Sequence, residues 1–224
     1  MLQERYRMSR SKGVLYLTDN QLPDKLWKLC QNTLIDAIGK LELVSSSREP
    51  IDFGTNVVTD LPRGYECYFK QILKGLETLT SDLVFIAEHD VLYPPEHFDF
   101  TPPDDSIYYD VNWWKVHDDG VAVSWEAEQV SGICAPRGVL LEWYRNKVET
   151  FNKDNFDRKF EPLSGEGSKQ WKAPLPHIDI RHGRNLTYNK KKLEHFRKKE
   201  TAVNFQSTTI DQIPGWSLSV TDIY

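Results

Sequence analysis

The stretch of residues 82–94 constrains the fold most, because a run of apolar side chains in it ends abruptly in polar ones. Its apolar and β-branched residues predict a strand in the centre of a sheet, ended by the prolines that follow. Glu88, His89 and Asp90 come directly after the apolar run. Ligands of open α/β sheets bind beyond the carboxyl ends of the strands. We therefore expect a ligand site at Glu88 and Asp90, whose spacing lets both carboxylates face one side of an extended chain. An acidic, solvated strand end is the alternative.

Apolar periodicity before this strand predicts that strands and helices alternate. Residues 13–20 and 41–44 have the pattern of strands, and residues 23–40 and 65–79 have apolar positions at helical spacing. An alternation of this kind places parallel strands between two layers of helices. The predicted fold class is therefore α/β, with a Rossmann-like, mixed but mostly parallel central sheet flanked by helices.

The second half of the chain predicts a hairpin, a helix, a charged loop and a final strand. Residues 106–116 and 120–125 have the pattern of two strands joined by an Asp-Asp-Gly turn. A helix is expected over residues 136–151. Residues 152–176 are charged and rich in turn residues, which is typical of a mobile loop, and residues 177–180 complete the sheet.

Length and composition are consistent with one main domain. The chain has 224 residues, of which 39% are hydrophobic, enough to build a core. We expect a flexible N-terminus over residues 1–12, a catalytic domain over residues 13–188, and a basic helix and tail over residues 189–224.

The sequence contains neither an apolar signal segment nor a run of apolar residues long enough to span a bilayer, so a cytoplasmic protein without a membrane span is expected. The three cysteines, Cys30, Cys67 and Cys134, are far apart and lie in apolar stretches, which predicts buried, reduced thiols. Nothing in the sequence indicates an oligomeric state.

Polar residues follow several of the predicted parallel strands, and such strand ends meet at one edge of a sheet. They are Thr18, Asp19 and Asn20 after the first strand, Ser45 to Ser47 after the second, and the acidic cluster that ends at Asp90. The sequence contains no glycine-rich phosphate loop, no Gly-x-Ser-x-Gly elbow and no His-Glu-x-x-His helix. Nucleotide binding at this edge is therefore the function that the pattern favours.

These features together resemble the GT-A fold glycosyltransferases of the family-2-like type, over roughly residues 14–146 and more weakly over residues 177–187. The features that carry the resemblance are Thr18-Asp19-Asn20, a helix that opens at Gly64 and carries Lys70, and Glu88-His89-Asp90 with Tyr93-Pro94 behind it. The metal motif of that family is normally Asp-x-Asp, and here Glu88 stands in the first position.

The resemblance implies a GT-A-like domain that uses a nucleotide-sugar, expected to be a UDP-sugar and first of all UDP-glucose. It assigns Asp90, with His182 as a further ligand, to a bound Mn²⁺ or Mg²⁺. It also implies a donor-binding set made of Thr18, Asp19, Asn20, Arg63, Lys70, Glu88 and Asp90. If the reaction inverts the anomeric carbon, a carboxylate must accept the acceptor's proton, and Glu126 or Glu128 is the candidate base.

The acceptor is suggested by charge. The formal net charge is −5, yet residues 184–199 hold seven basic residues and a single acid, Glu194. This basic end resembles that of phage-type enzymes that glycosylate hydroxymethylated pyrimidines in DNA, which would place the protein in a host cytoplasm. The residues expected to contact DNA phosphates are Arg184, Lys190, Lys191 and Lys192. A solvated helix face explains the same charges, and a glycan, a lipid-linked sugar or a protein is the alternative acceptor.

Two other functions fit the pattern less closely. A nucleotidyltransferase has a similar sheet with paired acids, but it usually begins with a glycine-rich basic loop where this chain has Thr18-Asp19-Asn20-Gln21. A noncatalytic module that binds a nucleotide-sugar is the third possibility.

Overall fold

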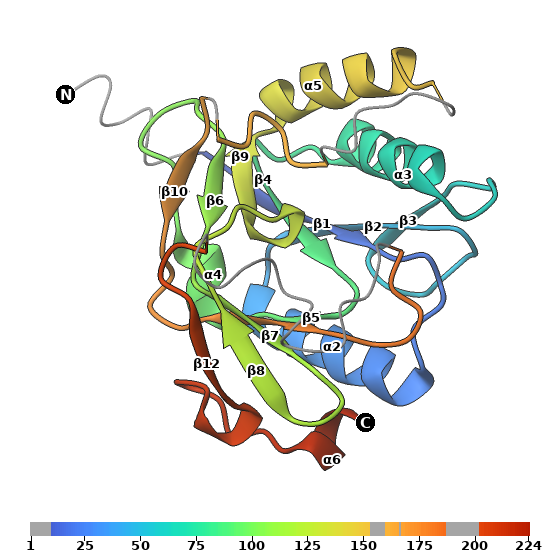
Figure 1. Ribbon diagram of the computed structural model, residues 1–224. Coiled ribbons are helices and arrows are strands. Elements are labelled where there is room, and N and C mark those ends of the chain that lie inside the picture. The colour runs from blue at the N-terminus through green and yellow to red at the C-terminus, as the bar shows by residue number, and fades with distance from the viewer. Residues whose placement is uncertain (1–9, 153–159, 166, 187–201) are drawn as a thin grey trace.

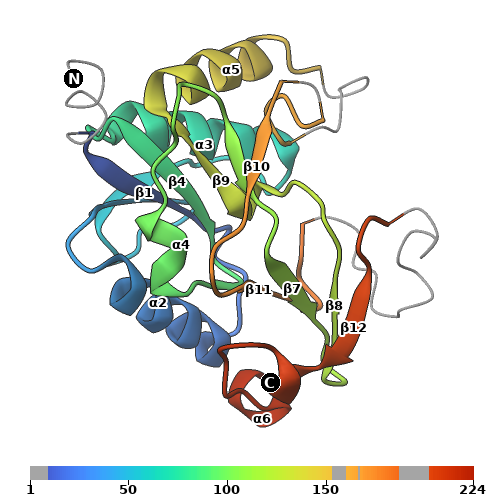
Figure 2. The same cartoon turned by 90° about the vertical axis from the view of Figure 1, so that its left-hand side faces the viewer.

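The computed structural model describes residues 10–152, 160–165, 167–186 and 202–224, which form two β-sheets with helices packed against them (Figure 1, Figure 2). Figure 1 shows helices on both faces of the larger sheet and the smaller sheet beneath one of its ends. Within these residues, every helix is too short or too polar to cross a bilayer.

The larger sheet has seven strands in the order β10-β6-β9-β4-β1-β2-β3. Their bounds are β1 Lys12–Leu17, β2 Glu42–Ser47, β3 Thr55–Val58, β4 Leu83–Glu88, β6 Tyr108–Asp110, β9 Ile133–Pro136 and β10 Lys169–Trp171. Strands β3, β2, β1 and β4 run parallel, and β10 runs parallel to β6, whereas β9 is antiparallel to both of its neighbours. The predicted α/β class with a mixed, mostly parallel sheet is confirmed.

Helices cover both faces of this sheet because successive side chains of a strand point to opposite faces. Leu15 and Leu17 of β1 pack in one cluster with α3 (Tyr65–Thr78) and α5 (Arg137–Glu149). Val14 and Tyr16 pack in another cluster with α2 (Asp24–Ile38). The approach of α3 is close: a Cβ atom on its Gly75 would lie 2.2 Å from Cδ1 of Leu15. Glycine at this position therefore lets the helix lie directly on the sheet.

The smaller sheet has five strands in the order β12-β8-β7-β11-β5. Their bounds are β5 Val91–Leu92, β7 Trp113–Val116, β8 Val121–Ser124, β11 His177–Ile180 and β12 Gln206–Thr209. The predicted hairpin is present, because β7 and β8 pair antiparallel. Its first strand, expected over residues 106–116, is divided: Tyr108–Asp110 form β6 of the larger sheet and only Trp113–Val116 form β7. The predicted last strand, β11, pairs parallel with β7, so it belongs to this second sheet. The short helices α4 (Pro95–Asp99) and α6 (Val220–Ile223) and two 3₁₀ turns, Val130–Gly132 and Ile210–Gln212, complete the fold.

Two strands lie in segments where the sequence predicts no strand. Residues Thr55–Val58 form β3 at the edge of the larger sheet, within a segment that has the composition of a polar loop. Lys169–Trp171 form β10, although residues 152–176 are predicted to be a mobile loop. Both strands are short edge strands held by backbone pairing, so neither carries the alternating apolar pattern that identifies a buried strand.

The C-terminal residues belong to the core of the smaller sheet. Strand β12 pairs antiparallel with β8, and Ile210, Ile213 and Ile223 pack in one cluster with Leu22 and Leu26 near α2. The expected division at residue 189 therefore differs from the structure, where residues 202–224 complete the sheet. The expected basic helix and the start of the chain lie in residues 187–201 and 1–9, outside the described residues. All three cysteines are free and buried, as predicted.

Candidate functional site

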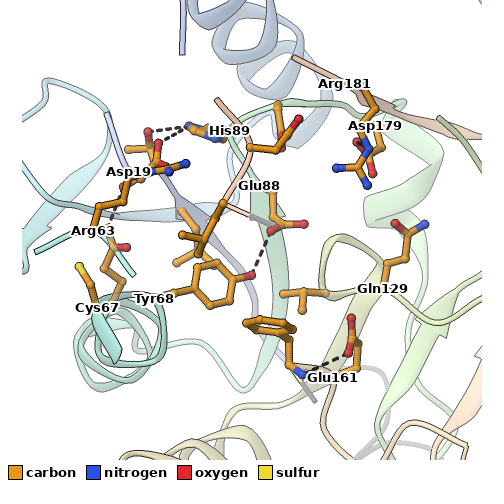
Figure 3. Close-up of a pocket in the computed structure, with 18 of the residues that line it drawn as sticks. Asp19, Arg63, Cys67, Tyr68, Glu88, His89, Gln129, Glu161, Asp179 and Arg181 are labelled. Carbon is orange, nitrogen blue, oxygen red and sulfur yellow. Dashed lines mark hydrogen bonds and ion pairs between the residues drawn. The ribbon is translucent and has the colours of Figure 1, made fainter. Parts of the chain in front are cut away.

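A pocket of about 400 Å³ lies at the carboxyl ends of β1 and β4, between the two sheets (Figure 3). One wall comes from α3 and the turn before it, and the opposite wall comes from β7, β11 and the segment before β9. In Figure 3 Asp19 and Arg63 stand on one side, Asp179 and Arg181 on the other, and Glu88 lies between them. The predicted meeting of polar strand ends is therefore realised for β1 and β4, whereas Ser45 to Ser47 are buried within β2.

The wall near β1 carries an arginine held by a carboxylate. Arg63 Nε lies 2.5 Å from Asp19 Oδ2, and the Arg63 guanidinium also donates to the backbone carbonyl of Arg184. The other Asp19 oxygen accepts a hydrogen bond from the backbone N–H of Gln21 at 3.0 Å. Arg48 lines the same part of the pocket. Two guanidinium groups in a pocket are suited to bind phosphate oxygens.

The other two residues of the Thr18-Asp19-Asn20 segment serve mainly to fix the backbone. Thr18 is buried at the pocket, and its hydroxyl accepts the N–H of Asn20 at 3.0 Å. Asn20 has a positive φ of 59° and lies outside the pocket lining. Its Oδ1 accepts the backbone N–H groups of Arg48 and Glu49 at 2.8 and 3.0 Å. Asn20 therefore positions the loop that carries Arg48.

Asp90 and His182 come from different strands and meet, as predicted; Asp90 lines the pocket, whereas His182 contacts Asp90 from outside the lining. Asp90 follows β4 and His182 follows β11, and His182 Nε2 lies 3.3 Å from Asp90 Oδ2. The amide nitrogen of Asn185 bridges the pair, at 2.8 Å from Asp90 Oδ2 and 3.1 Å from His182 Nε2. Burial opposes ionisation of Asp90, but its hydrogen bond with His182 and the nearby positive charge outweigh burial and hold its pKa at about 2. Asp90 is thus a carboxylate at neutral pH.

His89 also belongs to this cluster. One ligand atom from each of His89, Asp90 and His182 lies within 4.8 Å of the others. In a fully extended chain the side chain of His89 would point away from those of Glu88 and Asp90. In the structure, however, β4 ends at Glu88 and a turn follows. The imidazole therefore lines the pocket, where Nδ1 shares a hydrogen bond of 2.9 Å with the Thr18 hydroxyl.

Glu88 lines the same pocket as Asp90, but its carboxyl group has a different pKa. Burial, followed by the charges of Asp90 and Asp179, raises the pKa of Glu88 to about 8. The Tyr68 hydroxyl donates a hydrogen bond of 3.0 Å to Glu88 Oε1. Glu88 is therefore mainly neutral at pH 7, which suits a hydrogen-bonding group better than a ligand for a cation.

The wall opposite Arg63 contains a buried ion pair that the sequence analysis did not select. Lys115 Nζ lies 2.9 Å from Asp179 Oδ2 and donates to Gln129 Oε1 at 3.2 Å. Burial lowers the pKa of Lys115, although the charge of Asp179 opposes this shift. Arg181 Nε lies 3.8 Å from the other Asp179 oxygen. The sequence gives one signal for this wall. Lys115 is a charged residue between Trp114 and Val116 in a predicted strand.

The candidate bases and Lys70 have different positions. Glu128 lines the pocket, where its carboxylate accepts hydrogen bonds from Gly165 N, Ser168 Oγ and Gln170 Nε2 at 2.9 to 3.1 Å. Glu126 lies outside the pocket lining and pairs with Lys172. Lys70 also lies outside the lining, on α3, where it pairs with Glu66 at 2.7 Å.

Of the residues expected to contact DNA, only Arg184 is among those described. It is exposed beside the pocket, and its side chain donates to the backbone carbonyl of Gln21 at 3.3 Å. Lys190, Lys191 and Lys192 lie in the range 187–201, outside the described residues.

Comparison with models of known protein families gives no match, and comparison with curated proteins gives none either.

Proposed function

We propose that the protein is a metal-dependent GT-A glycosyltransferase that moves a sugar from a UDP-sugar to an acceptor hydroxyl. The observation that carries the proposal is the meeting of Asp90, which lines the pocket, with His182, which approaches it to 3.3 Å from a strand of the other sheet. The guanidinium groups of Arg63 and Arg48 line the same pocket and complement a diphosphate.

The residues around Asp90 fit a divalent cation. The amide nitrogen of Asn185 lies between the Asp90 carboxylate and the His182 imidazole. A group with partial positive charge therefore already occupies the space between the two proposed metal ligands. His89 adds a second imidazole, which favours Mn²⁺ over the harder Mg²⁺. When bound there, a divalent cation supplies Lewis-acid stabilisation of the charge on a departing diphosphate. Asp90 and His182 are its proposed ligands, with His89 as the third.

The chain's own groups would orient the donor. Arg63 is held by Asp19, so its guanidinium is positioned before a ligand arrives and little side-chain entropy is lost on binding. Thr18 and Glu88 present a hydroxyl and a largely neutral carboxyl to the pocket. These hydrogen-bonding groups suit a ribose or a base. Asn20 contributes by holding the Arg48 loop.

Glu128 is the better of the two candidate bases, because it lies at the pocket and Glu126 does not. Its hydrogen bonds from Gly165, Ser168 and Gln170 fix the position of the carboxylate. In an inverting reaction Glu128 would accept the proton of the acceptor hydroxyl.

The test is release of UDP from a panel of UDP-sugars, beginning with UDP-glucose, in the presence of Mn²⁺. We expect one donor to be turned over, and turnover to stop when EDTA is added. Equal turnover with EDTA would refute metal dependence. Release of pyrophosphate from a nucleoside triphosphate and a sugar phosphate, with no release of UDP, would favour a nucleotidyltransferase.

Arg63→Ala should weaken binding of UDP about 10- to 100-fold, because it removes a charge-assisted hydrogen bond to phosphate. Isothermal titration calorimetry with Mn²⁺ measures the change. Lys70→Ala is the matched control, since it removes a cation seven residues away that lies outside the pocket lining. Equal loss of affinity in both variants would show that the effect is general electrostatics and not phosphate binding by Arg63.

DNA is the acceptor that the basic segment favours. If Lys190, Lys191 and Lys192 contact phosphates, replacing all three with Gln should reduce the slope of log affinity against log salt by about 0.7 to 0.9 per lost contact. UDP-sugar hydrolysis should stay nearly unchanged. Replacing three exposed lysines elsewhere, Lys28, Lys40 and Lys74, is the control and should leave the slope intact. Absence of wild-type binding to duplex and single-stranded DNA at low salt would exclude this acceptor.

A further inference from the structure

We propose that His97, Asp110 and His177 bind a structural zinc ion in the interior, at a site separate from the pocket. None of these three residues lines the pocket, and the proposal does not depend on the proposed function. His97 lies in α4, Asp110 ends β6 and His177 begins β11. Three separate elements thus contribute one possible ligand each.

The distances fit a small ion. His97 Nδ1 lies 2.9 Å and His177 Nδ1 lies 3.4 Å from the same atom, Asp110 Oδ2, and ligand atoms of all three residues lie within 4.8 Å of one another. Ligand atoms around a tetrahedral zinc ion with bonds of about 2.0 Å are about 3.3 Å apart. Small side-chain movements therefore bring the three atoms into zinc geometry.

The cluster is fully buried and, among the described residues, contains ring nitrogens without a hydrogen-bond partner. All three side chains are 0% exposed. Within the described part of the chain, Nε2 of His97 and both ring nitrogens of His177 have no hydrogen-bond partner. Buried polar atoms are nearly always satisfied, and an unsatisfied one indicates a bound ion or water. A zinc ion bound through Nδ1 would give the His177 ring a partner.

The surroundings of Asp110 are arranged as in a metal site. Its Oδ1 accepts hydrogen bonds from the backbone N–H groups of Asn112 and Ala173 at 2.9 and 3.2 Å. These bonds fix the carboxylate so that Oδ2 faces the two histidines. Tyr93 stacks on His177 with ring centroids 5.6 Å apart, and Trp171 lies 5.4 Å from His97. Two imidazoles and one carboxylate with an apolar surround suit Zn²⁺, with a buried water as fourth ligand.

The position of the cluster indicates what the ion would do. β6 belongs to the larger sheet and β11 to the smaller one, so an ion shared by Asp110 and His177 would join the two sheets. β11 contains Asp179 and is followed by Arg181, and both residues line the pocket. The zinc ion would therefore fix the relative position of the two pocket walls.

The test measures zinc retained by the full chain. The protein is produced in zinc-containing medium, desalted, and analysed by mass spectrometry for metal content. A variant with Asp90→Asn and His182→Gln removes two ligands of the pocket cluster, and we expect it to retain about one zinc ion per chain, like the wild type. His177→Gln should lose the ion, and His177→Cys should retain it because thiolate is a zinc ligand. His117→Gln, which removes a buried histidine outside both clusters, is the control and should retain it.

The absorption of bound Co²⁺ gives a second test, which does not require the histidine variants to fold. The variant with Asp90→Asn and His182→Gln, loaded with Co²⁺ in place of zinc, should show the visible absorption of a tetrahedral site. Removal of the metal with a strong chelator should lower its melting temperature. Absence of both retained zinc and the cobalt absorption in this variant would overturn the proposal. Zinc content that His177→Gln leaves unchanged would overturn it as well.

Discussion

Asp90→Asn is expected to reduce turnover of the UDP-sugar by about 100-fold or more while the fold stays intact. An amide is nearly isosteric with a carboxylate but is a poor ligand, and loss of a group that stabilises developing charge costs about 10²- to 10³-fold in rate. Turnover is measured as release of UDP with Mn²⁺ at saturating donor, and circular dichroism checks the fold. Since Asp90 shares a hydrogen bond with Asn185, the amide can replace that contact and the local structure should persist.

Asp99→Asn is the matched control for this experiment. It is the same substitution at an exposed acid at the end of α4, away from the pocket, and should leave turnover unchanged. Full activity of Asp90→Asn would show that Asp90 is not a ligand of the proposed metal. The main support for a metal-dependent transferase would then be lost.

Lys115→Met should lower the free energy of unfolding by about 3 kcal/mol, because it removes the closest cation of the buried Asp179 carboxylate and leaves only Arg181, at 3.8 Å. The double variant Lys115→Met, Asp179→Asn removes both charges and should recover a large part of this loss. Chemical denaturation of the three proteins measures the effect. The double variant should be clearly more stable than Lys115→Met alone.

The control for this prediction is Lys70→Met, which breaks the exposed ion pair with Glu66. An exposed pair contributes at most about 1 kcal/mol, so this variant should stay close to the wild type. Equal destabilisation by Lys70→Met and Lys115→Met would contradict a special role for the buried pair.

The first half of the fold is predictable from sequence because its elements have strong apolar periodicity. The stripe of Phe69, Ile72 and Leu76 identifies α3, and the continuous apolar run before Glu88 identifies β4. Since parallel strands end at one edge, the meeting of Asp19 with the residues after β4 follows from the same reasoning. The approach of His182 to Asp90 agrees with the ligand set implied by the family resemblance.

The second pocket wall is not predictable in this way. Lys115 and Asp179 are brought together by the parallel pairing of β7 with β11, which are separated by some 60 residues in sequence. Hydrophobic pattern identifies a strand but does not specify its partner in such a pairing. The position of His89 is missed for a local reason, because β4 ends at Glu88 and the turn that follows brings the His89 side chain into the pocket lining.

Binding of UDP measured by isothermal titration calorimetry, with and without Mn²⁺, tests the central claim most directly. The proposal predicts that the wild type binds UDP with Mn²⁺, that affinity falls at least about tenfold when EDTA replaces the metal, and that Asp90→Asn binds equally weakly under both conditions. UDP affinity that is the same with Mn²⁺ and with EDTA, or absence of UDP binding under both conditions, would contradict a metal-dependent nucleotide-sugar site at this pocket.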